Sequence, residues 1–257
     1  MTGEALGPTL AGIFGALFGS FLNVCILRLP SDESVVSPPS RCPGCGSRIS
    51  WYDNLPIVSW FILRGRCRRC RQSISIQYPL IELAVALIWA GMAYRYGLGL
   101  VALRGAILFT ILLGIAMTDA RHYLIPDEFS LGGLVLGVAL SLPGGFVEIG
   151  RGLVGALIGF VVLWLVGVTG KWVFKEDAMG GGDIKMMAMV GAFVGWQGVL
   201  LTIFLGALLG SLVFVPLALI QRKRLVPFGV FLAVGAGAAF LFGPAILGWY
   251  WQFLGST

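Results

Sequence analysis

The 257 residues are strongly apolar: 58% are hydrophobic and 12% are charged, about half the charged share of an average soluble protein. A soluble domain of this composition could not cover its surface with polar groups, so the sequence predicts an all-α integral membrane protein. The apolar runs are continuous and about 20 residues long, which argues against the alternating pattern of a β-barrel. No basic segment precedes the first run, so no cleavable signal peptide is expected.

About eight transmembrane helices are predicted, and a long polar insert over residues 28–77 separates the first from the second. The predicted spans cover about residues 8–27, 79–96, 101–118, 129–146, 150–173, 184–197, 198–220 and 226–252. The sixth span is short and rich in Gly and Met. The chain therefore divides into a first transmembrane helix (1–27), the insert (28–77) and a helical bundle (78–257).

The distribution of positive charge predicts the orientation. The chain has 18 Lys and Arg and a net charge of +6. With eight spans, a cytoplasmic insert leaves only Arg95, Arg104 and Arg151 on the outside. The basic group Arg222, Lys223 and Arg224 then falls on the cytoplasmic side with the insert. The positive-inside rule thus favours a cytoplasmic insert and places both termini outside.

Four of the five cysteines form two CxxC pairs in the insert. These are Cys42-Pro-Gly-Cys45 and Cys67-Arg-Arg-Cys70, with 21 residues between the pairs. Each CxxC directs two thiolates at one centre, so the two pairs predict a closed four-thiolate site for one structural zinc per chain. An insert of this size has a small core that a metal would stabilise. Unligated or redox-active thiols are the alternative interpretation.

The basic insert also contains Trp51, Tyr52 and Trp60, a combination that can indicate nucleic-acid binding. Its position between two membrane spans instead favours contact with lipid headgroups, so we expect membrane lipid and no nucleic acid as a partner. Cys25 lies within the first apolar run and is interpreted as a small apolar residue. His122 is the sole histidine, which excludes multi-histidine metal sites and argues against Ser/His/Asp catalysis.

Two acidic motifs lie at the predicted cytoplasmic membrane edge. Asp119 ends the third span and is followed by Ile125-Pro126-Asp127, while Gly180-Gly181-Gly182-Asp183-Ile184-Lys185 leads into the sixth span. Two carboxyl groups that share a proton and a water can hydrolyse a peptide, because repulsion keeps one protonated while the other acts as base. The glycines would let a substrate backbone approach closely.

Each acid also has a simpler interpretation. Asp183 could cap the helix that follows it, and Asp119 could be a surface acid paired with Arg121. A proton-coupled transporter would also use carboxylates in the membrane. Glu82, near the cytoplasmic end of the second span, could pair with an arginine or contact the active region.

Five motifs together resemble the bacterial prepilin peptidases, which are GxGD-type membrane aspartyl proteases. In chain order they are Gly19-Ser20-Phe21-Leu22-Asn23-Val24 with Arg28-Leu29-Pro30, the two CxxC pairs, Gln77-Tyr78-Pro79 with Glu82-Leu83, Asp119 with Ile125-Pro126-Asp127, and Gly180-x-Gly182-Asp183-x-Lys185. The resemblance covers almost the whole chain. It implies that Asp119 and Asp183 are the catalytic pair and that Gly180, Gly182, Lys185, Pro126 and Asp127 shape the site.

The resemblance also implies two activities in the bacterial inner membrane. The first removes the basic leader from type IV prepilins and type II secretion pseudopilins on the cytoplasmic side, after a glycine. The second N-methylates the new terminal residue, usually phenylalanine, with S-adenosylmethionine. The family's methyltransferase function is associated with the N-terminal half, but the sequence shows no glycine-rich cofactor loop, so no cofactor residues are assigned. A related protease without pilin specificity is the nearest alternative.

Overall fold

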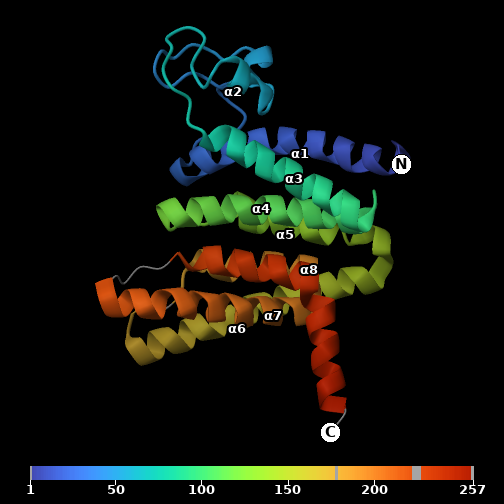
Figure 1. Ribbon diagram of the computed structural model, residues 1–257. Coiled ribbons are helices and arrows are strands. Elements are labelled where there is room, and N and C mark those ends of the chain that lie inside the picture. Colours follow the sequence, from blue (N-terminus) through green and yellow to red (C-terminus); the bar gives the residue numbers. More distant parts are fainter. Residues whose placement is uncertain (1, 177–178, 222–226, 256–257) are drawn as a thin grey trace. The chain divides into compact units, whose positions relative to one another are not determined.

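The computed structural model describes residues 2–176, 179–221 and 227–255, and within these ranges the regular structure is helical apart from two isolated β-bridges in the insert (Figure 1). The all-α prediction is therefore confirmed. The α-helices are α1 (Thr2–Arg28), α2 (Val58–Ile62), α3 (Gln77–Tyr96), α4 (Leu100–His122), α5 (Asp127–Ala139), α6 (Gly145–Phe174), α7 (Gly181–Gln221) and α8 (Phe228–Gly255). Short 3-10 turns lie at Leu29–Ser31, Trp51–Asn54 and Leu142–Gly144.

Five segments of the described chain are long and apolar enough to cross a membrane. They are Ala5–Ser31, Leu100–His122, Asp127–Val173, Gly181–Phe214 and Phe228–Phe253. Multiple apolar spans are thus present, whereas the number eight stays a prediction. The predicted sixth and seventh spans both lie in α7, whose helical backbone is broken at Gly195 (φ 73°, ψ 179°). This positive φ is a conformation that glycine adopts without steric cost.

The chain forms two compact units, one ending at Thr110 and one beginning at Ile111, within α4. Arg222, Lys223 and Arg224 lie outside the described residues. The cytoplasmic placement of the insert and the outward placement of both termini stay predictions, as does the division into functional domains.

In the N-terminal unit, α1 packs along α3 (Figure 1). Two glycines of α1 permit the close approach. A Cβ atom on Gly15 would lie 2.8 Å from the Cβ of Trp89, and one on Gly19 would lie 2.7 Å from the Cα of Glu82. In lipid, helices associate through packing, and small residues let their backbones come close. Gly19, the first residue of the N-terminal motif, therefore has a structural role.

In the C-terminal unit, α7 is the central helix and packs against α5, α6 and α8 (Figure 1). Its Met-rich first half is buried, with Met186, Met187 and Met189 inaccessible to solvent. α8 contains Pro244, and its last part, which leads to the C-terminus, runs across the direction of α6 and α7 (Figure 1). A proline inside a helix removes a backbone hydrogen bond and is a usual cause of such a bend.

The tightest contact between α6 and α7 involves glycines. A Cβ atom on Gly155 would lie 2.2 Å from the carbonyl oxygen of Gly191, and one on Gly159 would lie 2.2 Å from that of Met187. Because the opposing atoms are backbone, no side-chain rotation can relieve the overlap. The two helices could accommodate a larger residue only by moving apart.

We therefore expect Gly155→Ala to destabilise the C-terminal unit by about 1–3 kcal/mol, the usual cost of overpacking. Gly150→Ala on the same helix is the matched control, because its Cβ would meet nothing within 4 Å. Thermal unfolding of the two variants in the same detergent measures the difference. Equal melting temperatures would contradict the close packing of α6 on α7.

Candidate active site and cysteine cluster

Asp119 lies in the last turn of α4 and its side chain is buried. Its Oδ2 accepts a hydrogen bond from the backbone N–H of Val230 at 3.3 Å, and its carboxyl group also accepts one from the backbone of Gly229. These donors belong to the first turn of α8, where N–H groups have no partner within the helix and attract negative charge. The N-terminus of α8 therefore holds and orients the Asp119 carboxyl group.

Asp183 lies in the first turn of α7, where its N–H donates to the carbonyl of Gly180 at 3.1 Å. Its Oδ1 atom is buried and has no hydrogen-bond partner in the described part of the chain. Its carboxyl group lies near enough to that of Asp119 for the two charges to interact. A buried oxygen without a partner is uncommon and is often explained by catalysis or a bound water.

Ile125 packs against both segments that carry these aspartates. A Cβ atom on Gly182 would lie 3.0 Å from the Ile125 Cβ, and one on Gly229 would lie 2.9 Å from both the Ile125 Cδ1 and the Asp119 Oδ2. Ile125 is itself buried. The apolar residue of the Ile-Pro-Asp motif thus helps to space the two carboxyl groups, and Gly182 leaves room for it.

The remaining predicted residues meet at the same place. Lys185 donates to the Oδ1 of Asp127 at 2.5 Å, which joins the first turn of α7 to the start of α5. Pro126 is buried before α5. A Cβ atom on Gly180 would lie 3.1 Å from the Asp183 Oδ2. An exposed ion pair contributes about 0–1 kcal/mol to stability, so the pair's main effect is to align the two acidic motifs.

Sequence reasoning missed the contribution of Gly229 and Val230. The available signal was Pro227 directly before a long apolar segment, since proline often stands at the start of a helix and exposed N–H groups follow it. Nothing local in the sequence indicates that this helix start would meet Asp119, 111 residues away from Val230.

The four insert cysteines form one cluster. Their Sγ atoms all lie within 4.8 Å of one another, and those of Cys42 and Cys70 are 3.7 Å apart. Four thiolates around a tetrahedral zinc, with Zn–S distances of about 2.3 Å, would be separated by about 3.8 Å. The predicted convergence of the two CxxC pairs is therefore confirmed, and the donor set fits a metal ion.

The two CxxC segments share one backbone design, offset by 25 residues. The N–H of Cys42 donates to the carbonyl of Ser47, and that of Cys67 to the carbonyl of Gln72, at 2.9 and 2.8 Å. One isolated antiparallel bridge closes each segment: Arg41 with Arg48, and Arg66 with Ser73. The insert is thus built from two similar knuckles that present their thiols to a common centre.

Hydrogen bonds in the knuckles favour the thiolate form of Cys45 and Cys67. The side chain and the backbone of Ser47 lower the pKa of the Cys45 thiol to about 6. The backbone groups of Cys70 and Arg69 lower the pKa of Cys67. Metal binding requires deprotonated cysteine, so the local backbone prepares these two ligands for it.

Two family models match the chain. The bacterial peptidase A24 N-terminal domain matches residues 13–96, and the type IV leader peptidase family matches residues 106–215. No solved structure shows a significant match.

Curated relatives extend over nearly the full chain and carry the name prepilin leader peptidase/N-methyltransferase. The relative from Pseudomonas putida is 37% identical, covering 96% of this chain and 94% of its own length. The one from Aeromonas hydrophila is 35% identical, covering 94% and 93%. The one from Pseudomonas aeruginosa is 35% identical, covering 95% and 93%. With two family models in the expected order and full-length relatives, the chain belongs to the type IV leader peptidase family.

Proposed function

We propose that this enzyme removes the basic leader from type IV prepilins and type II secretion pseudopilins, and that Asp119 and Asp183 catalyse the cleavage. Membership of the peptidase family and the names of the relatives support the reaction class. The observation that carries the site assignment is the meeting of both acidic motifs around Ile125, with a buried Asp183 oxygen left without a partner.

The chemistry follows from two neighbouring carboxyl groups. One, as carboxylate, removes a proton from a water that attacks the scissile carbonyl, and the other donates a proton to the departing amide nitrogen. The pair titrates as one unit, so the shared proton belongs to both groups. The N–H groups of Gly229 and Val230 hold Asp119 in orientation throughout the cycle.

The membrane setting suits such a substrate. A prepilin has a basic leader followed by a long apolar helix, so its scissile bond lies at the membrane interface. In our topology the insert is cytoplasmic and both acidic motifs face the cytoplasm, where the leader remains. The membrane is the bacterial inner membrane, and its lipid headgroups contact the basic insert; nucleic acid is not a partner.

The second reaction is N-methylation of the new N-terminus with S-adenosylmethionine, in keeping with the names of the relatives. Zinc, one ion per chain, is held by Cys42, Cys45, Cys67 and Cys70, whose spacing suits it. All four positions are filled by cysteine, so the ion has a structural role.

Incubation of the purified protein with a prepilin and the methyl donor tests both reactions. Mass spectrometry of the product is expected to show a terminus that begins after the leader glycine and carries one added methyl group. An intact prepilin after prolonged incubation with folded protein would refute the proposed function.

Gly229→Ala should impair cleavage without removing either aspartate. The added Cβ would lie 2.9 Å from the Asp119 Oδ2, so the carboxyl group must move, and misplacement by about 1 Å can cost about 100-fold in rate. We expect kcat to fall by about 10- to 100-fold. Gly132→Ala is the control, because its Cβ would meet nothing within 4 Å. Unchanged kcat in Gly229→Ala would show that the α8 N-terminus does not position Asp119.

A further inference from the structure

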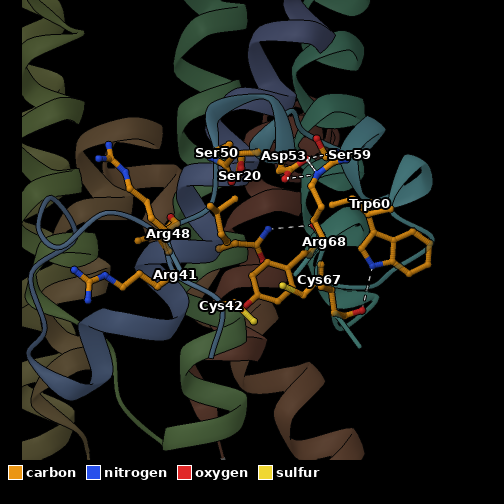
Figure 2. A pocket seen from close by; sticks show the side chains of 18 of the residues that line it. Ser20, Arg41, Cys42, Arg48, Ser50, Asp53, Ser59, Trp60, Cys67 and Arg68 are labelled. Atoms are coloured by element: carbon orange, nitrogen blue, oxygen red, sulfur yellow. Dashed lines mark hydrogen bonds and ion pairs between the residues drawn. The ribbon is translucent and has the colours of Figure 1, made fainter. Parts of the chain in front are cut away.

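The N-terminal unit contains a cavity of about 480 Å³ between α1, α3 and the insert, and Figure 2 shows part of its lining. This volume is within the range of small-molecule sites, about 300–1,000 Å³. Cys42 and Cys67 line it, so the cysteine cluster borders the cavity. The lining residues all belong to the N-terminal unit.

Asn23 of α1 lines this cavity and carries a hydrogen-bond acceptor without a partner in the described part of the chain. Its Nδ2 donates to the carbonyl oxygens of Gly19 and Tyr78, at 3.3 and 3.1 Å. These two bonds fix the amide orientation and leave Oδ1 buried without a partner in the described part of the chain. The Asn23 side chain is 2% exposed. A buried amide oxygen in this state calls for a hydrogen-bond donor from a bound water or a ligand.

Glu82 of α3 contributes a second acceptor. It is 8% exposed and lines the same cavity as Asn23. Its Oε2 accepts the backbone N–H of Ile57 at 2.6 Å, and Ser20 supplies a further hydrogen bond. The ion pairs found among the described residues do not include Glu82. A buried carboxylate without a cationic partner is unfavourable.

Arginines are present in this cavity but do not neutralise Glu82. Arg28 donates to the carbonyls of Ser34 and Pro38, and Arg68 forms an ion pair with Asp53 at 2.6 Å. In Figure 2, the side chains of Arg41 and Arg48 extend to the side opposite Asp53 and Arg68. Arg69 also lines the cavity, and no ion pair between it and Glu82 is found among the described residues. The acceptor pair of Glu82 and Asn23 is therefore left to a ligand that carries both positive charge and N–H donors.

We infer that Asn23 and Glu82 bind the α-amino group of the processed peptide, and that this cavity is where the amine is methylated. The inference rests on the methyltransferase half of the proposed function. A primary ammonium offers three N–H donors and one positive charge, which complements a buried amide oxygen and a carboxylate.

The site also supplies the proton acceptor that the reaction needs. The ammonium gives one proton to the Glu82 carboxylate, which frees the nitrogen lone pair. The nitrogen then bonds to the methyl carbon of the sulfonium donor, while the carbon–sulfur bond breaks and its electron pair stays on sulfur. The products are a secondary ammonium and a neutral thioether, and Glu82 returns its proton to water.

The test uses the full chain in lipid nanodiscs and a synthetic peptide that begins with a free phenylalanine, so no leader cleavage is required. An N-acetylated copy of the peptide lacks the ammonium. Wild-type protein should bind the free-amine peptide at least about 10-fold more tightly than the acetylated one. Glu82→Gln should abolish this preference and lower the methylation rate by about 100-fold or more.

Two further variants make the result specific. Asn23→Ala removes the unpartnered oxygen without changing charge and should also reduce the preference. Asp32→Asn removes an exposed acid of the same unit that does not line the cavity, and it should leave binding and methylation unchanged. Leader cleavage and metal content of each preparation report whether the protein is folded, and both should match wild type in Glu82→Gln.

Two results would overturn the inference. One is a retained amine preference and a retained methylation rate in both Glu82→Gln and Asn23→Ala. The other is that these variants lose affinity for S-adenosylhomocysteine but keep their preference for the free-amine peptide. That second result would assign the acceptors to the ammonium of the methyl donor. Binding and methylation of the synthetic peptide do not require Asp119 or Asp183, because no leader is cleaved. A failure of the proposed two-aspartate mechanism would therefore be seen only in the cleavage assay.

Discussion

Asp119→Asn and Asp183→Asn are each expected to lower leader cleavage by about 1,000-fold or more while the protein remains folded. General acid and base groups typically contribute about 100- to 10,000-fold each, and an amide can neither remove a proton from water nor protonate a leaving nitrogen. The asparagine keeps the size of the side chain, so the packing around Ile125 is preserved. Single-turnover cleavage of a prepilin, followed by mass spectrometry, measures the effect.

Two neighbouring acids serve as controls for this prediction. Glu128→Gln removes an exposed carboxylate in the first turn of α5 and should leave the rate unchanged. Asp127→Asn breaks the exposed ion pair with Lys185 and should have a modest effect, because that pair aligns the motifs without taking part in proton transfer. Near-normal cleavage by either Asp119→Asn or Asp183→Asn would remove that residue from the mechanism.

Replacing one cluster cysteine, as in Cys42→Ser, should remove the metal from the protein. Structural zinc binding contributes about 10–16 kcal/mol in small zinc-dependent domains, so loss of one of four ligands should unfold much of the insert. Because Cys42 and Cys67 also line the cavity of the N-terminal unit, N-methylation should be lost with the metal. Elemental analysis is expected to find one zinc per wild-type chain and close to none in the variant.

The fifth cysteine provides the matched control. Cys25 is buried within α1 and is not a member of the cluster, so Cys25→Ala should retain one zinc per chain. Carefully purified wild-type protein without zinc would contradict the metal assignment. Full N-methylation by metal-free Cys42→Ser would instead separate the cluster from the methylation site.

Composition and local spacing were sufficient to predict the class of fold and the four-cysteine cluster. Continuous apolar runs indicate membrane helices because backbone polar groups in lipid must be satisfied within the segment. Two CxxC pairs indicate a shared centre because each knuckle is a local structure, and the structure places all four Sγ atoms together. The number of spans was harder to predict from the sequence. The predicted sixth and seventh spans lie in one helix, α7, and the break between them depends on the backbone conformation of a single residue, Gly195.

The contacts of Glu82 could not be predicted from the sequence. Glu82 was open to two interpretations, an arginine partner or contact with the active region. The structure instead gives it the backbone N–H of Ile57, with no ion pair among the described residues. Its burial depends on α1 packing against α3 through Gly19, and such a long-range contact has no local signature.

The sequence by itself determined that this is a helical membrane protein with a four-cysteine cluster, and it singled out Asp119 and Asp183. These features depend on composition and on spacing along a short stretch of chain. Only the tertiary structure decided that the two acidic motifs meet around Ile125 and that α8 holds Asp119 by its N-terminal N–H groups. Those contacts join residues far apart in the chain, so they are set by how the helices pack and not by any local pattern.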